Sequence, residues 1–120
     1  MKQKSLSSVA PDVRKDYSKR VLFDISDLPP GGHMLQEVTI PPHTKQRAHY
    51  HNIQTEIFYI LSGECHIFIN EVDYLAKPGD AFVCSPKDVH NLWNQSDLPF
   101  SLLVFKVNRP DGDEDSVWSE

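Results

Sequence analysis

The chain has 120 residues and a formal net charge of −5 at pH 7. That length suits one domain with a single core and no cross-linking staples, and the negative charge, without a basic stripe interleaved with aromatic residues, excludes a nucleic-acid partner. No apolar run approaches the length of a membrane span, and residues 5–10 lack the apolar segment of a signal peptide. We therefore expect a cytoplasmic protein with no membrane partner.

The two ends of the chain are polar. Half of the twelve basic residues lie within residues 1–20, whereas residues 108–120 are rich in aspartate and glutamate. We therefore expect a polar N-terminal arm over residues 1–20, a folded barrel over 21–107 and an acidic C-terminal tail over 108–120. Within the tail, Trp118 could dock on the barrel, because an isolated aromatic side chain gains by burial.

Short apolar runs separated by proline and glycine turns predict a chain made of β-strands. Nine prolines and five glycines punctuate the sequence, and no segment has the periodicity of a helix. This pattern favours an all-β sandwich or barrel. In chain order, the expected strands cover residues 20–25, 34–40, 46–51, 56–61, 64–70, 73–75, 81–84, 90–94 and 100–107.

Four potential metal ligands lie on these strands. His49 and His51 are separated by one residue, so in a strand both imidazoles point to the same face. Glu56 opens the next strand, and a facing strand can deliver its carboxylate to the same point. Histidine and carboxylate ligands with open positions commonly hold a divalent first-row metal. His90, on a strand that follows two turns, is a fourth candidate.

These residues resemble the two sequence motifs of the cupin superfamily, G-x5-H-x-H-x3,4-E-x6-G and G-x5-P-x-G-x2-H-x3-N. The departures, at His43, Ser85 and Lys87, replace residues that shape the backbone and leave every ligand position unchanged. Seven positions match at fixed spacing, namely His49, His51, Glu56 and Gly63 in the first motif and Gly79, His90 and Asn94 in the second.

The resemblance covers about residues 35–107 and implies a fold, a metal site and a range of activities. The implied fold is a double-stranded β-helix, a jelly-roll barrel with the metal inside. The implied site holds one divalent transition metal per chain (Fe, Mn, Ni, Zn or Cu), and the ligand set does not choose among these metals. Cupins include dioxygenases, decarboxylases, isomerases, epimerases, lyases and proteins that bind sugars or hormones without catalysis.

The residues that line the pocket are predicted by counting alternate positions along the strands. Arg47 lies two positions before His49, so its guanidinium should enter the barrel beside the metal if the strand is regular there. Arg47 could clamp a carboxylate or phosphate, or it could form a salt bridge at the rim, and the sequence leaves both open. The other expected lining residues are the polar Gln36 and Asn94 and the apolar Phe58, Ile60 and Leu92.

A mainly apolar cavity with few polar groups suits a small organic molecule, and Arg47 indicates an anionic one. We expect a metal-dependent protein that acts on a small oxygenated acid or sugar-like molecule, with dioxygenase-type oxidation as the first hypothesis. The alternatives are a cupin that binds a small molecule at its metal without catalysis, and a sugar isomerase or epimerase. An isomerase needs a proton-transfer group beyond the metal ligands, for which the candidates are Tyr59, His66 and Glu37.

Two further features concern assembly and redox state. Residues 56–61 are apolar on both faces of their strand, which indicates that something covers the outer face of the sheet. Because small cupins are often homodimers, we expect a homodimer. Cys65 and Cys84 are expected to be buried and reduced, although the sequence also allows a disulfide bond between them.

Overall fold

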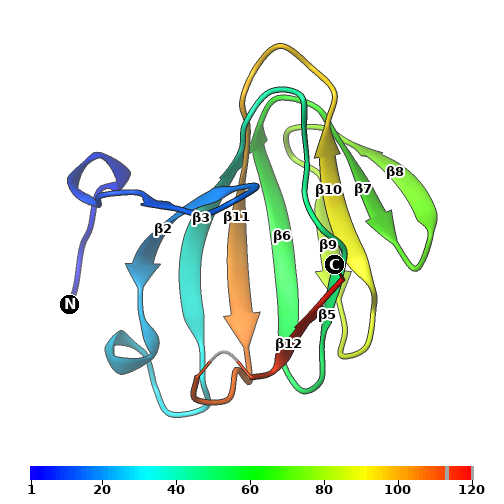
Figure 1. The fold of residues 1–120 in the computed structure, drawn as a ribbon. Helices are drawn as coiled ribbons and strands as arrows, with labels where there is room; N and C mark the ends of the chain where they lie inside the picture. Colours follow the sequence, from blue (N-terminus) through cyan, green and yellow to red (C-terminus); the bar gives the residue numbers. More distant parts are fainter. Residues whose placement is uncertain (113, 120) are drawn as a thin grey trace.

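The computed structural model describes residues 1–112 and 114–119, and it shows two β-sheets packed against each other (Figure 1). One sheet has the strand order β1-β2-β3-β11-β6-β9, and the other has the order β12-β5-β10-β7-β8, with β4 paired to β10. The all-β jelly-roll class predicted from the sequence is confirmed, as a sandwich of two sheets. The described residues include no helix that is long and apolar enough to cross a membrane.

The strands follow the predicted order, with additional short strands near both ends and before β5. Two short 3₁₀ helices, η1 (Leu6–Ser8) and η2 (Ile25–Asp27), flank the first strands. The strands are β1 (Asp12–Val13), β2 (Ser18–Phe23), β3 (Met34–Ile40), β4 (Thr44–Lys45), β5 (His49–His51), β6 (Thr55–Ser62), β7 (Cys65–Ile69), β8 (Val72–Ala76), β9 (Ala81–Cys84), β10 (His90–Asn94), β11 (Phe100–Val107) and β12 (Ser116–Trp118).

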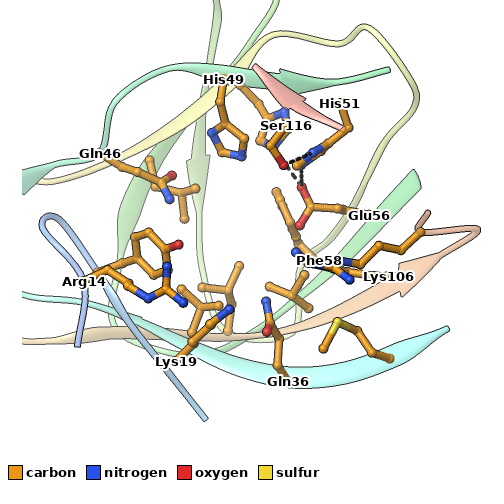
Figure 2. A pocket seen from close by; sticks show the side chains of 18 of the residues that line it. Arg14, Lys19, Gln36, Gln46, His49, His51, Glu56, Phe58, Lys106 and Ser116 are labelled. Carbon is orange, nitrogen blue, oxygen red and sulfur yellow. Dashed lines mark hydrogen bonds and ion pairs between the residues drawn. The ribbon is translucent and has the colours of Figure 1, made fainter. Parts of the chain in front are cut away.

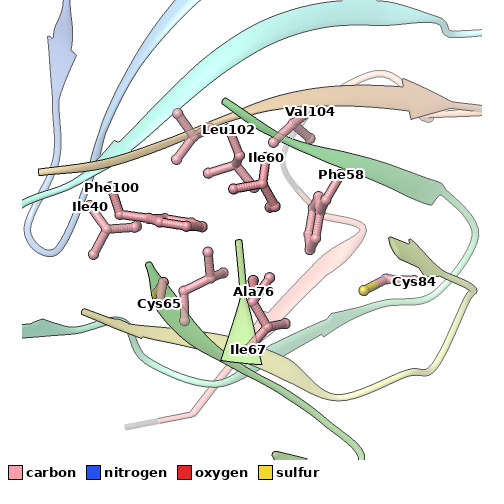
Figure 3. Packing of buried hydrophobic residues seen from close by; sticks show 12 residues of the cluster. Ile40, Phe58, Ile60, Cys65, Ile67, Ala76, Cys84, Phe100, Leu102 and Val104 are labelled. Atoms are coloured by element: carbon pink, nitrogen blue, oxygen red, sulfur yellow. The ribbon is translucent and has the colours of Figure 1, made fainter. Parts of the chain in front are cut away.

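The hydrophobic core lies between the sheets, and the alternation of β6 shows how the sequence builds it (Figure 3). Phe58 and Ile60 are buried, whereas their neighbours Ile57 and Tyr59 are exposed, as expected for a strand with one face inside. The core also contains aliphatic side chains from β3, β7, β10 and β11. These side chains fill part of the space between the sheets, and a cavity lies beside them.

The two cysteines belong to this core. Cys65 and Cys84 are both free and buried. Burial raises the pKa of each thiol to about 12, so both stay protonated at neutral pH. They therefore act as small apolar side chains, in agreement with the expectation of reduced, buried thiols.

Both polar ends of the chain form strands outside the expected barrel of residues 21–107. β2 starts at Ser18, inside the predicted arm of residues 1–20, and pairs with β3, while β1 pairs with β2. The reason is that β3 offers an open edge whose backbone groups need partners. At the other end, β12 lies within the predicted tail of residues 108–120 and pairs with β5. Both ends therefore contribute strands to the two sheets.

The outer face of β6 and β9 carries exposed apolar side chains. Ile57 is 38% exposed and Val83 is 58% exposed, and the two are direct cross-strand partners. Tyr59, 48% exposed, continues the same face. Exposed apolar side chains gathered in this way are typical of a protein–protein contact. A homodimer therefore stays a prediction, with this face as its expected contact.

We expect the wild-type protein to be a dimer and Val83→Lys to shift it toward monomers, because an interface would bury the lysine charge without a partner. Size-exclusion chromatography with light scattering at micromolar concentration measures the mass directly. Val72→Lys, at a site 52% exposed on the other sheet, is the matched control and should leave the mass unchanged. A wild-type protein that is monomeric throughout would contradict the expectation.

Candidate metal centre

The four predicted metal ligands come together in one buried cluster. His49, His51, Glu56 and His90 each offer a ligand atom, and these atoms all lie within 4.8 Å of one another. Figure 2 labels three of them, His49, His51 and Glu56. Each of the four side chains belongs to a buried residue. The arrangement is one that could hold a metal ion.

The strands explain why these residues meet. β5 places His49 and His51 on the same face, and β10 pairs with β5 so that His90 lies directly opposite His49. Glu56 comes from β6 in the facing sheet. Three imidazoles from one sheet therefore converge on one carboxylate from the other, across the interior of the sandwich.

The hydrogen bonds point the ligand atoms toward a common centre. Oε1 of Glu56 lies 2.5 Å from Nε2 of His51 and 3.1 Å from Nε2 of His90. The second ring nitrogens of these two histidines are engaged elsewhere: Nδ1 of His90 donates to the carbonyl of Asp88 at 2.9 Å, and Nδ1 of His51 lies 2.9 Å from the Ser116 hydroxyl. Such outer partners leave Nε2 for the metal, and the donor set fits a divalent transition ion. Nδ1 of His49 is buried without a hydrogen-bond partner.

The electrostatics of the cluster also suit a cation. Burial, reinforced by the nearby His90, lowers the pKa of His49 to about 3, so its ring is neutral at neutral pH. Burial alone would raise the pKa of Glu56, but hydrogen bonds from His51 and His90 outweigh it and hold this pKa well below its usual range. Neutral imidazole and ionised carboxylate are the forms that bind a metal.

The pKa of His90 shifts upward, in the opposite direction to that of His49. Burial would lower its pKa, but the hydrogen bond and negative charge of Glu56 outweigh burial and raise it above 6.5. His90 therefore holds a proton more readily than a free imidazole does. A metal ion that binds here has to compete with that proton.

The cluster forms part of the wall of a cavity of about 670 Å³ between the two sheets. This size is typical of small-molecule sites. Its apolar lining includes Phe58, Leu92 and Val104. Figure 2 shows Arg14 and Lys19 extending toward the same space as the histidines. The six cationic residues of the lining are Arg14, Lys15, Lys19, Arg47, Lys106 and Arg109, against two carboxylates, Asp24 and Glu56.

Three of the four predicted substrate contacts line this cavity: Gln36, Arg47 and Phe58. Arg47 forms a salt bridge, which is one of the two alternatives left open by the sequence. Its Nε lies 3.3 Å from Oδ2 of Asp16, and its guanidinium sits 4.7 Å over the ring of Trp118. Arg47 is therefore a salt-bridged residue of the cavity wall. Its position precedes β5, so the regular alternation assumed from the sequence does not apply there.

Asn94 is placed differently from the prediction. Its side chain is completely buried at the end of β10 and does not belong to the cavity lining. Nδ2 donates to the carbonyls of Ile40, Pro41 and Leu98, and Oδ1 accepts from the backbone N–H of Ser96. Asn94 therefore holds the turn that follows β10. Ile60, also expected in the lining, packs in the hydrophobic core instead.

The sequence did not indicate that both ends of the chain reach the cavity. Tyr17 and Lys19 line it from the N-terminal segment, and Ser116 and Trp118 line it from the C-terminal one. Trp118 stacks on His49, with ring centroids 4.0 Å apart and planes 19° apart. The isolated tryptophan in a charged tail was a signal for docking, but it did not say where the ring would dock.

Comparison with known proteins relates the chain to one protein family. A family model described as Cupin domain matches residues 36–106. An uncharacterized protein of Methanocaldococcus jannaschii is 30% identical over 69 residues, which cover 58% of this chain and only 55% of that relative. The tetracenomycin polyketide synthase protein TcmJ of Streptomyces glaucescens is 23% identical over 104 residues, covering 87% of this chain and 69% of TcmJ.

The solved structure of the polyketide cyclase RemF from Streptomyces resistomycificus is similar to the whole sandwich. It gives a TM-score of 0.80 at 22% identity and covers 96% of this chain and 89% of RemF. A likeness at this level of identity shows the shared fold and leaves the activity to be argued from the site.

The cluster predicts metal retention. Wild-type protein purified without an affinity tag should carry about one transition-metal ion per chain, and His49→Ala/His51→Ala should carry almost none. The variant should also melt at a lower temperature, because an ion that binds only the folded state stabilises it by mass action. Elemental analysis measures the metal. His66→Ala, whose ring pairs with Asp73 away from the cluster, should match wild type. Equal metal in wild type and the double variant would refute the assignment.

Proposed function

The chain belongs to the cupin family, and from this premise we propose that it is a metal-dependent enzyme that oxidises a small oxygenated organic anion, in a dioxygenase-type reaction. The observation that carries the proposal is the buried cluster of His49, His51, Glu56 and His90 in the wall of a cavity of about 670 Å³. A reactive centre and a space for a small molecule therefore share one site.

Three imidazoles and one carboxylate would hold the ion, and Fe, Mn, Ni, Zn and Cu all accept such donors. A bound ion supplies Lewis acidity or redox chemistry to oxygen atoms of the substrate. The protein contributes the fixed geometry of the donors and the cavity beside them. The hydrogen bond from His90 to the Asp88 carbonyl keeps that ring from turning away from the centre.

The charge of the lining supports an anionic substrate. Cationic side chains outnumber carboxylates by six to two in the cavity wall, although the whole chain has a net charge of −5. A local excess of positive charge in a negative protein attracts small anions to this opening. Part of this charge is internally compensated, as in the pair of Arg47 with Asp16.

The amides of the lining support a substrate that also carries hydrogen-bond donors. Oε1 of Gln36 and Oε1 of Gln46 are both buried without a protein partner, although their side chains border the cavity. Buried polar atoms of folded proteins are nearly always satisfied, so a ligand hydroxyl or an ordered water has to supply the missing donors. A hydroxylated organic acid has the charge and the donors that this wall would recognise.

The placement of ionisable groups supports oxidation over isomerisation. The proton-transfer candidates taken from the sequence, Tyr59, His66 and Glu37, all lie outside the cavity lining. Tyr17 does line it, but burial raises its pKa, so its hydroxyl stays protonated and is a poor base. None of the candidates taken from the sequence can therefore transfer a proton in the cavity, which favours chemistry centred on the metal.

The test of the function is oxygen consumption. Protein reconstituted anaerobically with Fe(II) should consume O₂ when mixed with one or more members of a panel of hydroxylated organic acids, measured with an oxygen electrode. His51→Ala should consume none under the same conditions. Binding of acids from the panel without O₂ consumption or product formation under any of the five metals would instead support a non-catalytic, metal-anchored binding protein.

Gln36 provides a separate test of the substrate contacts. Gln36→Leu removes a buried amide whose Oε1 has no protein partner, so the ligand-free protein should not lose stability. Affinity for the active acid should fall about fivefold to tenfold, which corresponds to about 1–1.4 kcal/mol for one hydrogen bond. Calorimetric titration and melting curves measure the two effects. Gln95→Leu, at an exposed position, is the control. Unchanged affinity in Gln36→Leu would remove Gln36 from the site.

A further inference from the structure

The C-terminal strand forms the outer neighbour of the strand that carries two of the ligands. β12 lies beside β5 in Figure 1 and pairs with it along its whole length. Ser116 is the register partner of His51, and Trp118 is that of His49. Further backbone bonds extend the pairing, from the Asn52 N–H to the Asp115 carbonyl and from the Ser119 N–H to the Ala48 carbonyl. Because β5 has only three residues, loss of β12 would leave it as a short, exposed sheet edge.

The side chain of Ser116 contacts a metal ligand directly. Its hydroxyl lies 2.9 Å from Nδ1 of His51, whose Nε2 faces Glu56. When the serine oxygen accepts a hydrogen bond from Nδ1–H of His51, the ring is held in orientation and its Nε2 lone pair is left for a cation. His90 obtains the same support from Asp88, two residues before it in its own turn. His51 depends instead on a residue 65 positions away along the chain.

Trp118 gives similar support to the other histidine of β5. Its ring stacks on His49 at 4.0 Å, while the guanidinium of Arg47 lies 4.7 Å from the centre of the same indole. Stacking fixes the plane of the imidazole by contact over a broad area. The two alternate residues of β12 therefore each hold one of the two alternate histidines of β5.

Asp115 anchors this strand to the loop between the ligands. The residue is only 6% exposed, although it lies in an acidic segment. Its carboxylate accepts hydrogen bonds from the backbone N–H groups of Ile53 and Gln54, at 2.9 Å and 3.0 Å, and from the Gln54 side chain at 3.2 Å. These bonds tie the tail to the loop that joins His51 to Glu56, and they place Ser116 beside His51.

We propose that β12 is a positioning element of the metal centre, and that Ser116, through its hydrogen bond to Nδ1 of His51, sets the metal affinity of the site. The inference rests on the proposed metal function, since it concerns how tightly the four ligands hold an ion. It goes beyond that function by making the metal site dependent on the docked C-terminal segment. A merely structural role for Ser116 would instead show as a loss of stability of the metal-free protein when its hydroxyl is removed.

The test compares three variants of the full chain: Ser116→Ala, which removes the hydroxyl, Ser116→Thr, which keeps it, and Ser119→Ala, an exposed control in the same segment. Metal-free protein is titrated with Co(II), whose visible absorption reports coordination, in competition with a chelator. We expect Ser116→Ala to bind Co(II) at least tenfold more weakly, within the range of 10–100-fold that loss of an outer partner of a ligand typically costs. Ser116→Thr and Ser119→Ala should stay close to wild type.

Melting of the metal-free proteins separates positioning from folding. The proposal expects Ser116→Ala to melt within about a degree of wild type without metal, while its metal-dependent stabilisation is smaller. Equal Co(II) affinity in wild type and Ser116→Ala would overturn it. A loss of affinity matched by an equal loss of metal-free stability would also overturn it, in favour of a structural role. Wild-type protein that binds no Co(II) would refute the metal function itself, and the inference with it.

Discussion

The buried carboxylate of Glu56 is the constraint on which the interior of this protein depends. An ionised carboxylate inside a sandwich of apolar strands is costly unless opposite charge and hydrogen bonds surround it. Here Nε2 atoms of His51 and His90 approach one and the same oxygen, at 2.5 Å and 3.1 Å. The two imidazoles that stabilise the carboxylate also belong to the cluster that could hold a metal ion with it. The candidate metal site is in this sense preformed by the fold.

Much of this centre was predictable from local sequence, because its placement depends on the two-residue period of a strand. His49 and His51 alternate within β5, Glu56 starts the inward face of β6, and His90 lies two residues before the inward-facing Leu92. The spacing of the cupin motifs supplied the remaining information, namely that β5, β6 and β10 bring these faces together. The all-β class followed from turn residues and alternation in the same way.

The structure differs from the sequence-based predictions where the two-residue period of a strand ends, or where contacting residues are distant in sequence. Arg47 precedes β5, so counting back from His49 did not show that Asp16 and Trp118 would surround its guanidinium. Asn94 has the inward orientation expected from its strand, but the following turn folds over it and uses all of its hydrogen-bonding capacity. The docking of β12 and the entry of Tyr17 and Lys19 depend on contacts across most of the chain, which no local pattern encodes.

The most direct measurement of the central claim is a crystal structure with anomalous diffraction recorded at the absorption edges of the candidate metals. The account predicts one anomalous peak per chain, about 2.0–2.2 Å from nitrogen atoms of His49, His51 and His90 and from a carboxylate oxygen of Glu56, as expected for these ligands. The second ring nitrogen of His51 should keep its bond to the Ser116 hydroxyl. A peak at any other place, or crystals of metal-supplemented protein without a peak inside the sandwich, would contradict the account.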